Sequence, residues 1–443
     1  MIFHYYLLST LFLLSLLFPY NISGFIKDSS NGEPVPFSNA IIQKSESDKV
    51  IKGSSSDING YFIITGLQPG DYILTASTIG YEIFRKEILI SDTDNQQNIR
   101  LDILLNPQPI SLNEVNVSSE RTRFNEKVEV SRVNITSEEI KMIPAFVESD
   151  VFRALQNLPS VSSANDFNAA LIVRGGSPDE NLVLLDGTQI YNPYHVGGIF
   201  STFNADLISD TEFLAGGFPA EYGNRLSSVL SITSKEGNSK EGRLPEGWGL
   251  KKYWDYNDIN LDVSLLSSKV SAQGPIYKGS WIFSGRRTYF DQFVKAYYNS
   301  KDETSPFDYY FWDTHFKIQT SPFKYHKFIY SQFNGSDNLF VQITAEDFPQ
   351  VNFDWDWINS TNSLEWKYYP NSNYFVETMI SRTKYQFDVG FEIDFTNIDQ
   401  ETIEECEESL GEDVEVGYAP DLTYVLVNSV KDYTLNQNYK LFI

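Results

Sequence analysis

The stretch that decides the fold runs from Ala170 to Lys235 and contains four short motifs in succession. They are Leu-Ile-Val-Arg174-Gly175-Gly176, Leu182-Val-Leu-Leu-Asp186-Gly187-Thr-Gln-Ile190, Phe218-Pro-Ala-Glu221-Tyr222-Gly223-Asn-Arg225 and Val229-Leu-Ser-Ile-Thr-Ser-Lys235. Residues 182–185 and 188–191 are predicted to be strands on either side of the Asp-Gly turn, because glycine accepts the positive φ of such turns. Short strands mixed with short helices, over about 120 residues, indicate a small α/β globule.

Two helices are predicted ahead of these strands. Thr136-Ser137-Glu138-Glu139 is a capping box, in which two side chains satisfy the free N–H groups at a helix start. This helix should run through Met142 and end before Pro144, because proline cannot continue a helix. A second helix is expected over about residues 150–157, where apolar side chains recur on one face.

Residues 22 to about 106 are expected to form a separate β-sandwich. Turn-forming sequences interrupt its β-branched runs at Gly32-Glu33-Pro34-Val35-Pro36, Asp57-Ile58-Asn59-Gly60 and Gly66-Leu67-Gln68-Pro69-Gly70. Asn-Gly and Pro-Gly favour turns, because glycine tolerates positive φ and proline presets its own φ. Short strands between regularly spaced turns are typical of sandwiches.

After Asn238 apolar and polar residues alternate over long spans, as in strands with one apolar face. The clearest runs are Leu261/Val263/Leu265, Val351/Phe353/Trp355/Trp357 and Leu364/Trp366/Tyr368. Short turns are expected near residues 277–279, 321–326 and 370–373, and long loops near 289–312, 335–350 and 389–421. A soluble sandwich would show the same alternation, but short turns at one rim and long loops at the other are typical of outer-membrane barrels.

About seven such strands are expected before the chain stops at Ile443. A barrel of about eight strands has room only for its own side chains, so the globule of about 120 residues could not lie inside it. An open edge inside a membrane would leave backbone groups unpaired, at a cost of several kcal/mol each. We therefore expect these strands to be the first part of a larger barrel, and the chain to be an amino-terminal fragment.

Composition narrows the classes of function. The chain of 443 residues has a net charge of −25, 15% aromatic residues and one cysteine, Cys406. The acidity argues against nucleic-acid binding, because phosphates need neutralising cations. The aromatic excess suits the interfacial girdles of a transmembrane β-barrel, and a single cysteine excludes an internal disulfide.

No group of residues suggests catalysis. The four histidines are scattered, and neither Gly-x-Ser-x-Gly nor His-Glu-x-x-His occurs. The acidic loop of residues 399–415 lacks the spacing of an EF-hand. We therefore expect no enzyme, no metal site and no cofactor.

The amino terminus carries an apolar run from about Tyr6 to Pro19, the length expected of a signal-peptide core. No Lys or Arg precedes the run and no Ala-x-Ala cleavage site follows it. A buried helix is the alternative, but an apolar extreme terminus ahead of a polar domain favours export.

In order and spacing, the four motifs resemble the plug domain of TonB-dependent outer-membrane receptors, which import scarce, bulky nutrients across the Gram-negative outer membrane. The residues that carry the resemblance are Arg174, Gly175, Gly176, Asp186, Gly187, Glu221, Tyr222, Gly223 and Arg225. It implies that Arg174 pairs with carboxylates of the barrel wall and that the glycines serve backbone conformation. The sandwich resembles carboxypeptidase-regulatory-like (transthyretin-like) domains, which often precede the plug.

The resemblance also implies two contact regions. Leu112-Asn113-Glu114-Val115-Asn116-Val117 stands where the family carries its TonB box, a segment that adds as a strand to a partner protein. An ordinary linker strand is the alternative. The second region is the plug apex, where Tyr191, Asn192, Tyr194 and His195 would face the extracellular ligand, unless this loop only packs against the wall.

The sequence thus predicts a multidomain, mainly β chain: signal peptide 1–20, sandwich 21–107, TonB-box-like linker 108–120, plug 121–238 and partial barrel 239–443. The resemblance implies a place in the outer membrane, with the plug and amino-terminal domain on the periplasmic side. The implied partners are a TonB-type energy-transducing protein, outer-membrane lipid, a surface lipoprotein and an extracellular siderophore, glycan, peptide or vitamin. Two alternatives are a surface adhesin or assembly protein, which would not need residues 112–117, and a periplasmic signalling protein.

Overall fold

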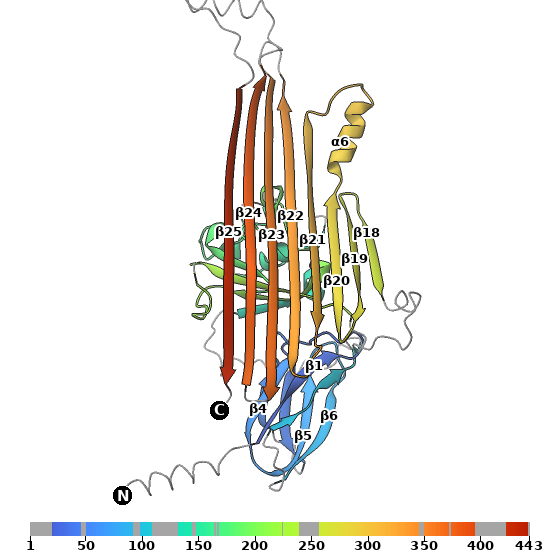
Figure 1. The fold of residues 1–443 in the computed structure, drawn as a ribbon, viewed down its shortest axis with the longest axis vertical. Coiled ribbons are helices and arrows are strands. Elements are labelled where there is room, and N and C mark those ends of the chain that lie inside the picture. Colours follow the sequence, from blue (N-terminus) through green and yellow to red (C-terminus); the bar gives the residue numbers. More distant parts are fainter. Residues whose placement is uncertain are drawn as a thin grey trace, which may run out of the picture.

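The computed structural model describes residues 20–45, 50–91, 98–108, 132–143, 148–163, 165, 168–223, 225–238, 257–344, 350–371, 374–394 and 422–441. They form an N-terminal domain, a central domain and a tall antiparallel sheet that stands beside the central domain (Figure 1). The predicted signal-peptide core, the TonB-box segment, Cys406 and the acidic loop 399–415 lie outside the described residues.

The N-terminal domain is a sandwich of two sheets, as predicted. One sheet has the order β4-β1-β7, with β8 also paired to β1, and the other has the order β3-β2-β5-β6. The strands are β1 Tyr20–Asp28, β2 Asn39–Lys44, β3 Val50–Ser55, β4 Tyr61–Leu67, β5 Gly70–Ser77, β6 Phe84–Ile90, β7 Asn98–Arg100 and β8 Ile103–Leu105. Ile22, Ile26, Phe62 and Leu74 lie in its apolar core. The predicted Asn59-Gly60 turn is present, with a φ of 75° at Gly60.

The central domain is the α/β globule that the four motifs predict. Its main sheet has the order β13-β12-β17-β16-β9, in which only the β12–β17 pair is parallel. Its strands are β9 Arg132–Thr136, β10 Val161–Ser162, β11 Ile172–Val173, β12 Asn181–Leu185, β13 Thr188–Gln189, β14 Tyr194–His195, β15 Phe200–Ser201, β16 Ile208–Leu214 and β17 Ser228–Ser234. Its helices are α3 Ser137–Met142, α4 Val151–Leu155 and the 3-10 turns η1 Pro178–Glu180, η2 Val196–Gly198 and η3 Ala205–Leu207.

Both predicted helices begin where the sequence places them. The Thr136 side chain accepts a hydrogen bond from the Glu139 N–H, and the Glu139 carboxylate accepts one from the Thr136 N–H, so the capping box is complete. Asp150 caps α4 by accepting hydrogen bonds from the N–H groups of Phe152 and Arg153. The second helix ends earlier than predicted, at Leu155.

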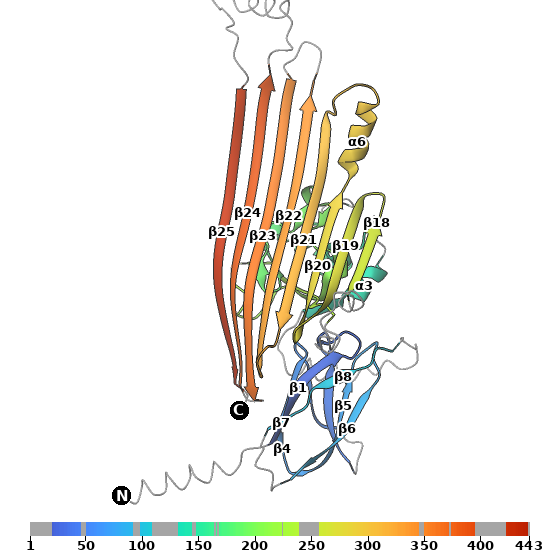
Figure 2. The same ribbon diagram turned by 45° about the vertical axis from the view of Figure 1, so that its right-hand side comes forward.

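The third part, here called the wall, is an antiparallel sheet of eight strands paired in chain order from β18 to β25. They are β18 Asp258–Val263, β19 Ser267–Ile276, β20 Gly279–Thr288, β21 Phe307–Thr320, β22 His326–Ile343, β23 Gln350–Asn371, β24 Tyr374–Asp394 and β25 Leu422–Leu441. Helix α6, Phe290–Asn299, lies between β20 and β21. Figure 2 shows the strands bending around the central domain.

The wall has eight strands where the sequence predicts about seven, and some of them are longer than expected. The expected loop at 335–350 is wrong over its first half, because β22 continues through Asn334-Gly335-Ser336 to Ile343. This turn-like sequence stays extended because it pairs on both sides, with β21 and with β23. Similarly, β24 continues beyond Val389 to Asp394.

The apolar alternation of β23 changes face along the strand. Trp357, Asn359 and Thr361 occupy odd positions and are buried toward the central domain, whereas Leu364 is 53% exposed on the other face. The outward face carries a row of directly paired apolar residues across six strands: Trp281, Ile318, Tyr330, Leu364, Ile380 and Leu435. No helix among the described residues has the length and apolar character required to cross a lipid bilayer.

Candidate functional site

The Asp186-Gly187 turn lies against the inner face of the wall. Asp186 and Gly187 have φ values of 47° and 73°, as a two-residue hairpin turn between β12 and β13 requires. A Cβ atom on Gly187 would lie 3.3 Å from the sulfur and methyl of Met379 on β24. Glycine therefore permits both the backbone conformation and the close approach to the wall.

Asp186 joins the central domain, from here on called the plug, to the wall through a buried ion pair. The Lys317 Nζ of β21 lies 3.0 Å from its Oδ1, and the Ser331 hydroxyl of β22 donates to its Oδ2 at 2.9 Å. The side chains of Asp186 and Lys317 are only 10% and 5% exposed. Burial alone would raise the pKa of Asp186, but Lys317 and His315 outweigh it and hold the pKa well below its ordinary range.

His195 forms a second attachment of the plug to the wall. Its Nδ1 lies 2.5 Å from Asp337 and its Nε2 lies 3.5 Å from Asp313. Its ring stacks on Phe311 at a centroid distance of 4.0 Å. Burial would lower the pKa of His195, but Asp337 and Asp313 outweigh it, so the pKa is raised above the ordinary 6.5.

Arg286 of β20 links this attachment to the start of the central domain. Its Nε lies 2.7 Å from Asp313, and its Nη2 donates to the Ser201 carbonyl at 3.1 Å. Glu148 lies 3.5 Å from Arg286 and 2.9 Å from Lys269 of β19. The group therefore consists of alternating charges, each with an opposite neighbour, as buried charges require.

The wall carries many buried polar side chains on its inner face. They include Ser280, Ser284, Arg286, Asp313, His315, Lys317, Gln319, Ser331, Asp337, Asn359, Thr361, Ser363, Lys367, Ser381 and Thr383. The apolar core of the plug also includes Phe333 of β22. The contact between plug and wall is therefore rich in hydrogen bonds and ion pairs.

The attachment at His195 is expected to weaken as pH rises. A group whose pKa is raised in the folded state stabilises fully below its unfolded pKa, and this stabilisation is lost as pH rises through the folded pKa. Backbone hydrogen exchange at β14 and β15, corrected for intrinsic pH dependence, should therefore accelerate above pH 6.5, the ordinary value for histidine. His195→Gln should remove this pH response, whereas His326→Gln, at the far end of β22, should retain it. An unchanged response in His195→Gln would contradict the assignment.

The loop predicted to face a ligand touches the wall at several points. The Tyr191 hydroxyl donates to Asp432 of β25, and the Asn192 carbonyl accepts from the Asn359 amide at 2.7 Å. The Tyr194 hydroxyl accepts from the Leu171 N–H at 3.3 Å, and burial raises the pKa of Tyr194 to about 12. Tyr194 is half-buried and His195 is buried, so both side chains serve packing here, and their contact with a ligand stays a prediction.

An aromatic column stands on the inner wall beyond this loop. Trp357 is two residues from Asn359 on the same face, and Trp355 packs against it at 5.1 Å. Phe353 lies 4.9 Å from Phe391, with which it is directly paired across β23 and β24. The aromatic alternation is evident in the sequence but its face is not, because only the packed plug shows which side of the strand is inward.

The Arg174-Gly175-Gly176 motif lies in the turn after β11. Arg174 is exposed, with a φ of 51°, and Gly175 has a φ of 80°. A Cβ atom on Gly176 would come within 2.6 Å of the Ser227 hydroxyl, so this glycine is required by close packing. The buried arginine at the boundary between plug and wall is Arg286, for which the sequence holds no motif. The role of Arg174 as a wall contact stays a prediction.

The third motif lies in the loop between β16 and β17. Glu221 and Gly223 are exposed, whereas Tyr222 is half-buried and packs against the small cluster around Leu182. Arg225 is half-buried.

The described residues on either side of the TonB-box segment are Gln108 and Arg132. Both line a cavity between the N-terminal domain, the plug and the wall. Among the described residues there is no group of three or more His, Cys, Asp or Glu that could hold a metal ion.

Two family models match the chain. A CarboxypepD_reg-like domain matches residues 22–117, and a TonB-dependent Receptor Plug Domain matches residues 125–228. These matches fall on the sandwich and on the central domain.

Several solved structures are similar to the chain. The ferric yersiniabactin uptake receptor FyuA from Yersinia pestis is 9% identical, with a TM-score of 0.39, over 71% of this chain and 61% of that one. The siderophore receptor PirA from Pseudomonas aeruginosa is 14% identical, with a TM-score of 0.32, over 70% and 60%. The ferric citrate transporter FecA in the unliganded form is 12% identical, with a TM-score of 0.37, over 72% and 56%.

The chain spans between 56% and 61% of the length of these three structures. TM-scores this low add no weight to the assignment, which rests on the two domain matches and on the fold. The chain therefore carries a CarboxypepD_reg-like domain and a TonB-dependent receptor plug domain, in this order, ahead of an antiparallel wall.

Proposed function

We propose that the chain acts in TonB-dependent import of a bulky nutrient across the outer membrane. In this proposal the plug blocks a channel bounded by the wall, and a ligand binds beyond the plug at the end away from the N-terminal domain. An energy-transducing partner then pulls on the chain ahead of the plug and opens a path.

The polar contact between plug and wall carries this proposal. An apolar contact would lose about 25 cal/mol for every Å² exposed when the plug moved. Polar and charged groups can instead exchange their partners for water, so the net loss per hydrogen bond is only about 0.5–1.5 kcal/mol. The ion pairs of Asp186 and His195 thus suit a plug that is held firmly and must also move.

The outward face of the wall supports the membrane location. Leu364, Ile380 and Leu435, in the row that crosses six strands, are 53%, 58% and 68% exposed. Exposed apolar side chains in register form the lipid-facing band of outer-membrane barrels. We place the end near the N-terminal domain in the periplasm and the opposite end outside the cell.

The aromatic column supports the proposed position of the ligand. Phe353, Trp355 and Trp357 rise from the loop that begins at Tyr191, on the inner side of the wall. Flat aromatic faces favour a ligand with planar or apolar surfaces. Siderophores, peptides, vitamins and the faces of sugar rings all meet this requirement.

The proposal is tested by a substitution in the segment Leu112–Val117, which we propose as the TonB box. Val115→Pro removes a backbone donor that strand addition needs. The full product of the gene should then no longer bind the periplasmic domain of the TonB-type protein of the same bacterium. Energised uptake by cells should also fall to background, measured with a panel of ⁵⁵Fe-loaded siderophores and labelled oligosaccharides.

Ser119→Pro, just outside the segment, is the matched control and should retain both binding and uptake. Unchanged uptake in the Val115→Pro protein, for a probe that the unmodified protein imports, would contradict the proposal. Surface display without uptake of any probe would favour the adhesin alternative.

A further inference from the structure

The N-terminal domain packs against one end of the wall, the lower end in Figure 1, through an aromatic contact. We describe this position as seated. Phe25 of β1 lies 5.0 Å from Tyr369, and Tyr61 of β4 lies 5.9 Å from Phe375. Phe25, Tyr61 and Phe375 are only 8%, 7% and 1% exposed. Aromatic side chains on the surface of a sandwich are normally exposed, so their burial here shows a specific contact between the two parts.

Arg100 at the end of β7 joins the same contact. Its guanidinium carbon lies 5.1 Å from the ring centre of Tyr369, 5.6 Å from that of Tyr325 and 5.5 Å from that of Phe25. Tyr325 lies in the turn between β21 and β22, and Tyr369 lies near the end of β23. A cation over the face of an aromatic ring is attracted by that ring, so all three rings contribute to the contact.

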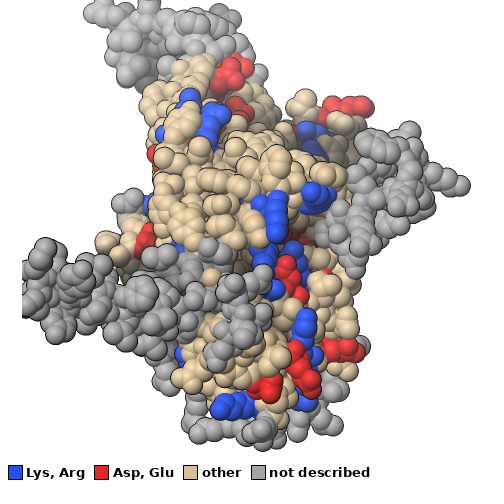
Figure 3. Space-filling view, turned by 60° about the horizontal axis from the view of Figure 1, so that its bottom comes forward, with Lys and Arg blue, Asp and Glu red and all other residues tan. Residues whose placement is uncertain are grey.

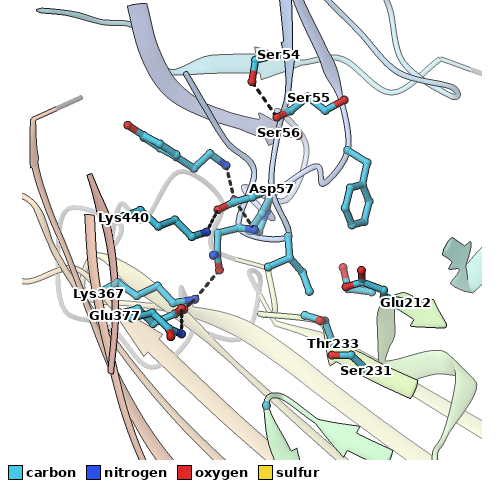
Figure 4. A pocket seen from close by; sticks show the side chains of 18 of the residues that line it. Ser54, Ser55, Ser56, Asp57, Glu212, Ser231, Thr233, Lys367, Glu377 and Lys440 are labelled. Carbon is cyan, nitrogen blue, oxygen red and sulfur yellow. Dashed lines mark hydrogen bonds and ion pairs between the residues drawn. The ribbon is translucent and has the colours of Figure 1, made fainter. Parts of the chain in front are cut away.

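Polar contacts surround the aromatic centre. The turn at Asp57–Gly60 reaches two wall lysines: Asn59 accepts from the Lys367 Nζ at 2.5 Å, and Asp57 lies 3.5 Å from the Lys440 Nζ. Glu33 accepts a hydrogen bond from the Gly237 N–H at 3.1 Å, at the point where the plug leads into the wall. Figure 4 shows Asp57 directed at Lys440, with Lys367 beside Glu377.

Charges of both signs lie side by side on the molecule seen from this end (Figure 3).

The N-terminal domain forms one side of an open chamber below the plug. A cavity of about 2460 Å³ is lined by all three parts of the chain. The plug contributes Asp186 and Glu212, the wall contributes Lys317 and Lys367, and the segment Ser54–Asn59 of the N-terminal domain forms the opposite side. A solute that passed the plug beside the wall would enter this chamber.

We propose that the N-terminal domain is a cap on the periplasmic mouth of the channel. Seated on Tyr325, Tyr369 and Phe375, it restricts passage from the chamber, and it must leave this surface for a bulky solute to pass. This inference rests on the proposed function for its biological meaning, but the cap itself is passive and requires neither a partner nor a ligand.

The first test asks whether the domain is seated in the outer membrane of living cells. In the full product of the gene with Cys406→Ser, a short bismaleimide should join Asp57→Cys to Lys440→Cys in most molecules. Arg100→Glu should lower the yield about tenfold, because it removes the cation between the rings. Lys86→Glu makes the same change of charge at an exposed position of β6 and should leave the yield unchanged.

The second test measures passage with vancomycin, which intact outer membranes exclude. In cells whose receptor carries Arg286→Met to loosen the plug, adding Arg100→Glu should lower the inhibitory concentration severalfold. Adding Lys86→Glu should leave it unchanged, and the Asp57–Lys440 cross-link should raise it.

Absence of the cross-link in the otherwise unmodified protein would overturn the seating. Equal vancomycin entry with and without Arg100→Glu, in cells where the cross-link forms, would overturn the cap. Neither measurement uses the TonB-type partner or an imported probe. A failure of uptake in the Leu112–Val117 experiment therefore remains distinguishable from a failure of the cap.

Discussion

Replacing Asp186 with asparagine is expected to loosen the plug strongly, and a second change, Lys317→Met, is expected to restore most of its stability. Asp186→Asn leaves the Lys317 ammonium, 5% exposed, without the carboxylate 3.0 Å away. Breaking a buried ion pair by removing one partner costs about 3–5 kcal/mol. In the double variant no charge is stranded at this point, and replacing both members of a buried pair with neutral groups is often neutral or stabilising.

Hydrogen exchange at the amides of β12 and β13 measures this effect directly. At about 1.4 kcal/mol per factor of ten, Asp186→Asn should accelerate exchange by about 100-fold or more, and the double variant should return close to the unmodified rate. Ser331→Ala is the matched control, because it removes one neutral hydrogen bond to the same carboxylate, worth about 1 kcal/mol. Equal exchange in the single and double variants would show that charge pairing does not hold this turn.

Because the pKa of Asp186 is low, the same contact is expected to weaken as pH falls. A carboxyl whose pKa is depressed by folding stabilises above its unfolded pKa, and this stabilisation is lost as pH falls toward the folded pKa. The turn should therefore stay attached at neutral pH and weaken only below the ordinary 3.8 of an aspartate. This response is opposite in sign to that of His195.

The second large effect is expected at Arg286. Arg286→Met removes the cation 2.7 Å from Asp313 and 3.5 Å from Glu148. Both carboxylates are almost fully buried, so the loss should again be about 3–5 kcal/mol. The region around β14 and β15 should open more often, and vancomycin should enter cells that carry the variant.

Lys295→Met is the matched control for Arg286. It breaks an ion pair of similar length, Lys295 to Asp308 at 2.6 Å, but Lys295 is 43% exposed on α6. An exposed pair is worth only about 0–1 kcal/mol, so exchange and vancomycin entry should remain as in the unmodified protein. Equal effects of the two variants would mean that burial does not set the strength of the attachment at Arg286.

Local features of the chain could be predicted from the sequence. The capping box at Thr136 and the Asp186-Gly187 turn depend on contacts within a few residues, so the sequence contains all that determines them. The sandwich and the α/β plug follow from turn spacing and motif order. The continuation of β22 through Gly335 could not be predicted, because pairing with strands on both sides overrides its turn-like composition.

The candidate site could be predicted only in part. Arg286 and Arg287 are adjacent in the sequence, yet Arg286 is buried against the plug while Arg287 lies 4.6 Å from the ring of Tyr310 on the opposite face. A shift of one residue in strand register exchanges the two roles. Likewise, only the packed plug shows that Trp355 and Trp357 face inward while Leu364 faces outward.

The edge position of β9 has a mechanical consequence. Strand β9 is the last in its sheet and pairs with β16 alone among the described strands, reinforced by the ion pair of Arg132 and Glu212 at 2.6 Å. At its other end the plug is tied to the wall, because the Glu236 carbonyl accepts from Ser280 and its carboxylate lies 2.5 Å from Lys327. A tensile load applied ahead of Arg132 therefore meets a strand that can detach singly, while β16, β17 and β12 remain paired. The plug is built to yield at the loaded end first and to stay tethered at the other.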